Sequence, residues 1–391
     1  MTELDLLYTE VEEDLRASVR DLLTDRCPPS AVTALYDGDR SAVAGLWKAL
    51  ACDLGLAGLL VPESRGGAGG SAREAAVVLE ELGRAVAPVP FLTSAVVATT
   101  ALLDGDDGDL LAEVAAGART AALLVPLPTA PHDTVPAAGA GPAGGVVGAG
   151  PAGGVVGAGP AGGAVRADRG QLTGTVTGVA GVLDADVLLV PATTPDGIGL
   201  FAVPVAAAGV DPVVSLDMTR QLADVTLDGA AGSPVAADAE SVVRRALRTG
   251  AALLASEQIG LAGWCLHETV GHLRQRTQFG RVLGGFQALK HRLADLAVDL
   301  DSATAAARYA AAALAAGDPD TEIATAVAQA YCSDAAVRAA EEAVQLHGGI
   351  GMTWEHPAHL YLKRAKADQI AFGTAGRHRA HLAGLVELPA P

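Results

Sequence analysis

The sequence has no long apolar run, although half of its 391 residues are hydrophobic. A membrane-spanning helix needs roughly 18 or more consecutive apolar residues, and no stretch of this chain approaches that length. The first ten residues include acidic side chains and lack the basic residues with which a secretory signal begins. We therefore expect a cytoplasmic protein with no membrane partner.

Cysteine is scarce, and its four copies lie far apart with no CxxC pair, at Cys27, Cys52, Cys265 and Cys332. Disulfide frameworks and zinc sites use paired or regularly spaced cysteines, so this spacing predicts buried thiols and no metal site. Basic residues are also in the minority, with 27 Lys and Arg against 45 Asp and Glu, a formal net charge of −18. Because phosphate binding needs a basic face, this balance argues against a nucleic-acid partner.

Residue patterning divides the chain into an N-terminal helical domain (1–118), a middle β-domain (119–237) and a C-terminal four-helix-bundle domain (238–391). Apolar residues recur at helical spacing in the first and last parts. The helices that this spacing predicts include 72–82, 241–274, 286–315 and 323–346. In the middle part, short runs bounded by Gly, Pro or Asp, most of them with β-branched residues, predict strands at 121–125, 187–190, 199–203 and 223–227.

A repeat interrupts the β-domain. The nine-residue segment GAGPAGGVV occurs at 139–147 and 148–156, and again with one change at 157–165. Repeats of this length occur in β-helices and in some binding elements. Three copies of Gly, Ala and Pro with pairs of Val bury too little apolar surface to form a core. We therefore interpret 139–165 as a flexible surface loop and assign it no function.

Two motifs in the last part carry a resemblance. The segment from Arg276 to Gln287 reads RTQFGRVLGGFQ, which resembles the RxQFGxxLxxFQ signature of the acyl-CoA dehydrogenase family. The segment from Gln345 to Gly351 reads QLHGGIG, which resembles that family's QxxGGxG motif. With the helix–β–helix order, the resemblance covers nearly the whole chain outside the repeat. It implies the acyl-CoA dehydrogenase fold.

The residue types in both motifs suit a flavin dinucleotide. A guanidinium makes bidentate contacts to a pyrophosphate, and paired glycines let backbone N–H groups approach a phosphate. The resemblance implies that these segments reach across a subunit interface and hold the adenosine-diphosphate half of a neighbour's FAD. The cofactor-binding candidates are Arg276, Gln278, Phe279, Gln287, Gln345, Gly348 and Gly349.

The catalytic carboxylate of the family is missing. The family's reaction removes the proton α to a thioester, so a carboxylate must lie beside the α-carbon. The family's Tyr-Glu-Gly-Thr run matches Ala371–Thr374 here, with Phe372 at the position of the base. Other members carry the base near the position of Gly250, where this chain has no acid either. Glu257 is the nearest carboxylate on that helix; we interpret it as solvated or paired with an arginine such as Arg248, and a role as base is the alternative.

The β-domain also departs from the family beside the flavin ring. Members offer a Thr-Glu-Pro run and a Trp-Ile-Thr run to the ring, whereas this chain has LLVP at 123–126 and VAGVL at 179–183. The chain thus keeps the motifs that it would donate to a neighbour. It lacks the contacts that would hold a flavin ring of its own.

The missing base leaves three hypotheses about function. In the first, the chain resembles the subunit without the glutamate in actinobacterial heteromeric acyl-CoA dehydrogenases. A heterotetramer with a homologous subunit would then desaturate a CoA- or carrier-bound acyl group and pass electrons to an electron-transfer flavoprotein; an oligomer of this chain with itself is the alternative. In the second, the fold performs non-redox dehydration or cyclisation, with His347, Glu355 and His356 as candidate groups. In the third, the chain is a structural or regulatory subunit without a site of its own.

Overall fold

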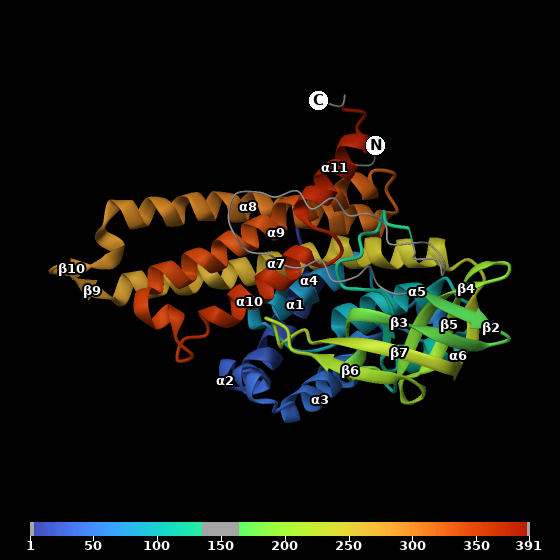
Figure 1. The fold of residues 1–391 in the computed structure, drawn as a ribbon. Helices are drawn as coiled ribbons and strands as arrows, with labels where there is room; N and C mark the ends of the chain where they lie inside the picture. The colour runs from blue at the N-terminus through green and yellow to red at the C-terminus, as the bar shows by residue number, and fades with distance from the viewer. Residues whose placement is uncertain (1–3, 135–163, 389–391) are drawn as a thin grey trace.

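The computed structural model describes residues 4–134 and 164–388, which form a helical part, a β part and a second helical part in chain order (Figure 1). The GAGPAGGVV repeat lies outside the described residues up to position 163, where its interpretation as a loop stays a prediction. At its last residue the interpretation is wrong, because Val165 is buried and begins strand β2 (Val165–Asp168). Within the described ranges, no helix combines the length and the hydropathy that crossing a bilayer requires.

Short helices build the N-terminal part. Two of them begin with a capping box: the side chain of Thr9 accepts a hydrogen bond from the backbone of Glu12, and the Glu12 carboxylate accepts one from the backbone of Thr9. Ser71 and Glu74 repeat this arrangement at the start of α4. A π-helical segment, Phe91–Ala98, precedes α5. The helices are α1 (Glu10–Arg26), α2 (Pro29–Ala34), α3 (Ser41–Lys48), α4 (Ala72–Ala85), α5 (Thr99–Leu103) and α6 (Gly108–Ala115).

The middle part is one sheet in the order β6-β7-β3-β2-β4-β5-β8, with β1 paired in parallel to β4. Alternate residues of a strand enter different cores: Leu189 of β4 packs against the helices, whereas Leu188 and Val190 enter a core of the sheet itself. All four predicted strands are present. The strands are β1 (Ala121–Leu123), β2 (Val165–Asp168), β3 (Gln171–Ala180), β4 (Val187–Thr194), β5 (Gly197–Pro204), β6 (Gly209–Val213), β7 (Leu222–Ala231) and β8 (Ser233–Ala236).

Three long antiparallel helices dominate the C-terminal part, and two shorter ones pack on α9 (Figure 1). Alanines fill the contact between the long helices, because a small side chain permits close approach; Ala307 and Ala328 are fully buried there. The helices predicted from apolar spacing are confirmed. The elements are α7 (Ala239–Gln275), the hairpin β9 (Thr277–Gln278) and β10 (Arg281–Val282), α8 (Gln287–Ala316), α9 (Thr321–His347), α10 (Ala358–Ile370) and α11 (Ala375–Leu385).

Helices α4 and α7 touch backbone to backbone. A Cβ added at Gly83 would lie 2.0 Å from the carbonyl oxygen of Glu257, and one added at Gly260 would lie 1.9 Å from that of Glu80. Only glycine permits this approach. The crossing fixes the middle of α7, and with it Glu257, against the N-terminal part.

Candidate functional site

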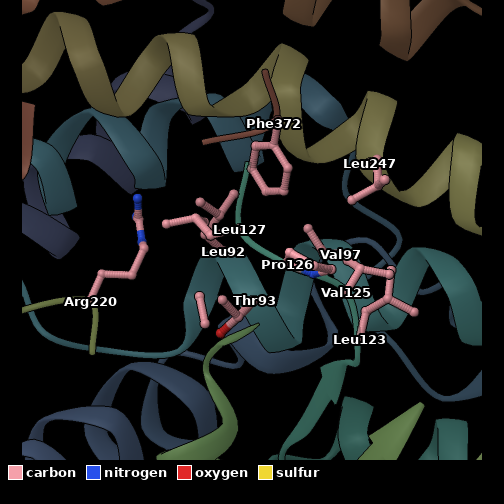
Figure 2. A pocket seen from close by; sticks show the side chains of 11 residues that line it. Leu92, Thr93, Val97, Leu123, Val125, Pro126, Leu127, Arg220, Leu247 and Phe372 are labelled. Carbon is pink, nitrogen blue, oxygen red and sulfur yellow. The ribbon is translucent and has the colours of Figure 1, made fainter. Parts of the chain in front are cut away.

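A small apolar cavity lies where the three parts of the chain meet (Figure 2). Its volume is about 30 Å³, which is room for two or three water molecules, whereas pockets for small-molecule ligands measure roughly 300–1,000 Å³. Among the residues that line it, Thr93 supplies the one hydroxyl and Arg220 the one charge, and no carboxylate is present. The lining residues are Leu92, Thr93, Val97, Leu123, Val125, Pro126, Leu127, Ala180, Arg220, Leu247 and Phe372.

Phe372 points into this cavity from the turn that follows α10 (Figure 2). Its backbone has a left-handed conformation, with φ 54°, which is uncommon for a bulky residue. Two hydrogen bonds hold that conformation: the Phe372 N–H donates to the carbonyl of Leu127 at 2.9 Å, and Nε2–H of His378 donates to the carbonyl of Phe372 at 2.9 Å. Burial lowers the pKa of His378 to about 4 against the opposing effect of this hydrogen bond, so the ring is neutral at pH 7.

Gly250 of α7 faces the ring of Phe372. A Cβ at Gly250 would lie 3.0 Å from Cζ of Phe372 and 2.8 Å from a methyl carbon of Val97. Positions 250 and 372, where members of the family carry the base, are therefore neighbours in space. One carries a phenyl ring and the other carries no side chain, so neither can accept a proton.

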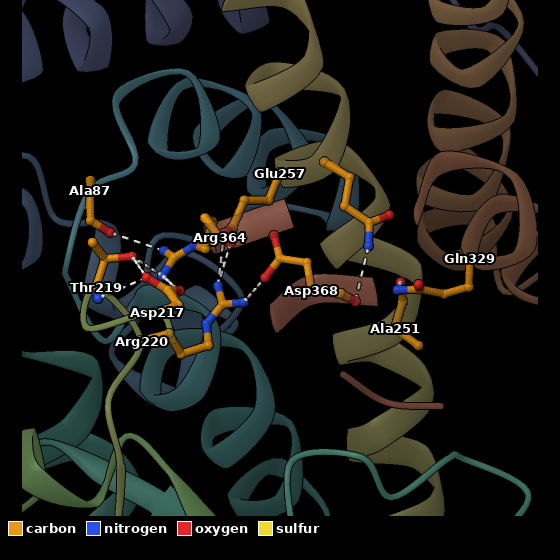
Figure 3. Close-up of polar contacts among 10 residues, drawn as sticks. Ala87, Asp217, Thr219, Arg220, Ala251, Glu257, Gln329, Arg364 and Asp368 are labelled. Atoms are coloured by element: carbon orange, nitrogen blue, oxygen red, sulfur yellow. Dashed lines mark hydrogen bonds and ion pairs between the residues drawn. The ribbon is translucent and has the colours of Figure 1, made fainter. Parts of the chain in front are cut away.

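Glu257 is buried and does not line the cavity. Its Oε1 accepts hydrogen bonds from Nη2 of Arg220 at 2.8 Å and from Nε of Arg364 at 2.7 Å, and its Oε2 accepts from Arg220 at 2.6 Å (Figure 3). The interpretation of Glu257 as paired with an arginine is confirmed, but its partners are Arg220 and Arg364 rather than Arg248, and the alternative that it is solvated is wrong. The reason is tertiary: the loop before β7 and helix α10 bring two other arginines to it.

The same network continues on both sides (Figure 3). Arg220 also pairs with Asp368, and Arg364 pairs with Asp217 at 3.3 Å and donates to the Thr219 hydroxyl at 2.8 Å. Two amides tie α7 to its neighbours, since Gln258 donates to the carbonyl of Asp368 and Gln329 to that of Ala251. The network fixes the guanidinium of Arg220, the one charge that lines the cavity.

The two buried carboxylates of this network have opposite pKa shifts. Burial alone would raise the pKa of Glu257, but the attraction of Arg220 and Arg364 outweighs it and lowers the pKa. Burial raises the pKa of Asp368 to about 7 despite the attraction of Arg220. Glu257 is thus held as an anion by two cations, which makes it a poor proton acceptor.

The motif residues lie together at the far end of the C-terminal bundle (Figure 1). Arg276 caps α7, Gln278 and Phe279 belong to the β9–β10 hairpin, and Gln287 begins α8. Phe279 is 89% exposed and, like Phe372, has a left-handed backbone, with φ 55°.

The second motif reaches the same end of the bundle. Gln345 is exposed near the end of α9, where Gly348 (φ 66°) and Gly349 turn the chain. A Cβ at either glycine would meet no atom within 4 Å, so the backbone of this turn is open to a ligand. The rings of His272 and His347, with centroids 4.4 Å apart, join the ends of α7 and α9.

The candidates for non-redox chemistry also lie at this end and not at the cavity. The ring centroids of His347 and His356 are 4.1 Å apart, and Glu355 is exposed. Of the cysteines, Cys27, Cys265 and Cys332 are buried as predicted. The prediction for Cys52 is wrong, because the side chain is exposed beside the end of α6.

Sequence reasoning missed the Arg220 network. One signal was available: Arg364 and Asp368 are four residues apart, a spacing that places two side chains on one face wherever the segment is helical. Nothing local connects that face with Arg220 or Glu257, which come from other parts of the chain.

Comparisons with known proteins agree with this fold. Residues 9–107 match the family model for the acyl-CoA dehydrogenase N-terminal domain, and residues 241–385 match that for the C-terminal domain. The chain is 36% identical over 358 residues to acyl-CoA dehydrogenase IpdE2 of Mycobacterium tuberculosis, which covers 91% of each protein.

Two solved structures are similar over nearly the whole chain. A variant of the Tcur3481-Tcur3483 steroid ACAD has a TM-score of 0.79 and 28% identity, covering 97% of this chain and 98% of that one. The ChsE4-ChsE5 complex from Mycobacterium tuberculosis has a TM-score of 0.81 and 26% identity, covering 99% and 100%.

Proposed function

Because the chain belongs to the acyl-CoA dehydrogenase family, whose members are oxidoreductases that act on CH–CH bonds, we propose that it is the subunit without a base in a heteromeric enzyme of this family. A homologous second subunit supplies the carboxylate that removes the α-proton. This chain supplies the motif residues at the end of its bundle. The assembly desaturates an acyl thioester between its α- and β-carbons.

The observation that carries this proposal is that Phe372 and Gly250 leave the cavity without a proton acceptor. The separation of the two half-sites along α7 supports a contribution to another subunit. From Gly250 beside the cavity to Arg276 at the end of the helix, 26 residues at about 1.5 Å each span roughly 39 Å. That exceeds the length of a dinucleotide, so the motif residues and the cavity of one chain cannot hold the same FAD. Motif residues that bind FAD must therefore act on a cofactor seated in another subunit.

The residues at the bundle end fit the adenosine-diphosphate half of FAD. Arg276 offers an exposed guanidinium, and the turn at Gly348 and Gly349 offers backbone without a Cβ in the way. The cavity beside Phe372 does not fit the flavin ring, because it is small and apolar. Bound FAD supplies the acceptor for the hydride that leaves the β-carbon.

The relatives support a bulky, ring-containing acyl thioester as the substrate class to test first. One similar structure is described as a steroid ACAD, and another is a complex of two different chains. The cavity beside Phe372, at about 30 Å³, is far too small for such a group. We therefore propose that the acyl group binds in the partner and that an electron-transfer flavoprotein is the electron acceptor.

Flavin absorbance of the purified protein tests the proposal. We expect the chain expressed alone to bind little flavin, and its co-expression with a homologue encoded nearby to give a yellow complex that desaturates a thioester. A yellow, active homo-oligomer of this chain would overturn the proposal. If the partner subunit kept its full flavin content and activity without this chain, a purely structural role of this chain would be supported instead.

A matched pair of variants tests the residues. Arg276→Ala in the co-expressed complex should weaken FAD binding about tenfold or more, because a hydrogen bond to a charged group contributes roughly 1.5–3 kcal/mol. Arg274→Ala, two residues earlier and also exposed, should leave FAD binding unchanged. Equal FAD affinities in both variants would exclude Arg276 from the cofactor site.

A further inference from the structure

Three histidines and a glutamate gather where α7, α9 and the segment before α10 meet. Glu268, His347 and His356 each offer a ligand atom, and these three atoms lie within 4.8 Å of one another. The ring centroid of His272 lies 4.4 Å from that of His347. Glu268 and His272 are one helical turn apart on α7, so both face the same way.

The hydrogen bonding of His347 indicates that this cluster can bind a cation. Its Nδ1 lies 2.7 Å from the carbonyl oxygen of Ala343, and a carbonyl can only accept, so Nδ1 carries the proton. In the neutral form of such a ring, the lone pair is on Nε2. That atom is buried and has no hydrogen-bond partner among the described residues, and the side chain is 5% exposed. A buried lone pair without a donor is unfavourable unless a cation meets it.

The neighbours of His347 provide further ligand atoms. Two of them, His272 and His356, are imidazoles, whose neutral form binds a metal. The carboxylate of Glu268 makes no hydrogen bond or ion pair within the described part of the chain.

We propose that Glu268, His272, His347 and His356 bind a divalent transition-metal ion such as Zn²⁺. Imidazole and carboxylate ligands suit zinc, and four protein ligands are typical of a structural site. The bond from Nδ1 of His347 to a backbone carbonyl is the outer contact that orients a metal-binding histidine. The spacing of the four cysteines predicted no metal site, but this cluster contains no cysteine.

Binding requires the side chains to move. Bonds of about 2.0–2.1 Å in a tetrahedron place ligand atoms roughly 3.3 Å apart, so Glu268, His347 and His356 must close by about an ångström or more. His272 lies outside that group of three and must move further. Nδ1 of His356 accepts a hydrogen bond of 3.2 Å from the backbone of Ala358, and binding through Nε2 moves the ring proton to Nδ1 and breaks it. The loss is one long, weak hydrogen bond.

The metal would fasten the end of α9 to α7. His347 is the last residue of α9 and directly precedes Gly348, so the ion would hold the glycine turn beside the end of α7. Its role is structural and stands whether or not the chain has a partner subunit.

Cobalt binding tests the site. The untagged full-length chain, alone and in its co-expressed complex, is stripped with a chelator and titrated with Co²⁺, whose tetrahedral complexes absorb visible light strongly. We expect one tetrahedral Co²⁺ per chain, displaced by Zn²⁺, and a higher Tm with either metal. Octahedral spectra alone, or no binding, would overturn the proposal.

Variants locate the site. Glu268→Gln and His347→Gln should each weaken Co²⁺ binding at least tenfold. Glu268 is only half-buried, so its variant keeps the test decisive if His347→Gln does not fold. His267→Gln is the matched control, because His267 is exposed and adjacent to Glu268 on α7. Wild-type affinity in Glu268→Gln, or equal losses in all three variants, would refute the assignment.

Discussion

Replacing Glu257 by glutamine separates a structural role from a catalytic one. The carboxylate accepts three hydrogen bonds from Arg220 and Arg364, and all three side chains are almost fully buried. Glu257→Gln keeps the shape but leaves two guanidinium groups without their shared anion. It also turns an amide N–H₂ toward N–H donors, which cannot accept its hydrogen bonds.

The expected loss is large. Removing one partner of a buried ion pair costs about 3–5 kcal/mol, and after this change Asp368 and Asp217 are the remaining partners of the two buried guanidinium groups. With an unfolding entropy of about 2.1 cal/mol/K per residue, a chain of 391 residues should lose roughly 4–6 °C in Tm. Scanning calorimetry measures this, and urea unfolding gives the free energy.

Glu240→Gln is the matched control, because Glu240 lies on the same helix and pairs with Arg244 in an exposed i,i+4 contact. That contact contributes at most about 0.5 kcal/mol. A Glu257→Gln protein as stable as the control would refute the structural assignment. If such a stable variant also abolished desaturation in the complex, Glu257 would be the base after all.

Two further predictions concern the same region. Asp368, whose pKa burial raises from 3.8 to about 7 against the attraction of Arg220, binds its proton more tightly in the folded than in the unfolded state. The free energy of unfolding that this proton contributes below about pH 4 is therefore lost as the pH rises toward 7. Asp368→Asn should remove this dependence on pH. Equal slopes of the unfolding free energy against pH in the wild type and the variant, measured by urea unfolding between about pH 4 and 8, would contradict the prediction. Gly250→Ala should destabilise the protein by about 1–3 kcal/mol, because the new methyl group meets Phe372 and Val97 at 3.0 and 2.8 Å. Gly263→Ala on the same helix is the control: its new methyl group would meet no atom within 4 Å, so it should stabilise the protein by up to about 1 kcal/mol. If urea unfolding gave both variants a change in unfolding free energy of the same sign, the contact with Phe372 would not be rigid.

Local pattern predicted the fold because most elements are long or strongly periodic. Helix α7 was predicted at 241–274 and spans Ala239–Gln275, since its apolar spacing persists over the whole length. The strands β4 and β5 were predicted shorter than they are, because Thr193 and Thr194 continue pairing beyond the apolar run. Sequence patterns locate the centre of an element better than its end.

The site was less predictable, because its contacts join distant segments. Motif spacing pointed to Arg276 and Gln345 as members of one site, and the structure brings both to one end of the bundle. The partners of Glu257 could not be found that way. Arg220 is 37 residues before it and Arg364 is 107 residues after it, and no local rule connects the three.

One substitution would not restore a base at this cavity, because the shape of the whole cavity is unsuited to a carboxylate. An acid at position 250 would meet the ring of Phe372, whereas an acid at position 372 would lie among aliphatic walls with only Thr93 and Arg220 to offer polar contacts. Burial among those walls would favour the protonated form of such an acid, and an acid that is already protonated cannot remove a proton from a thioester. Restoring the chemistry would therefore require a wider cavity, a second change opposite the first and polar contacts for a flavin ring. The closed cavity beside Phe372, together with the exposed Arg276 and the open glycine turn at the other end of α7, is therefore the basis on which we propose that this chain contributes to a neighbour's site.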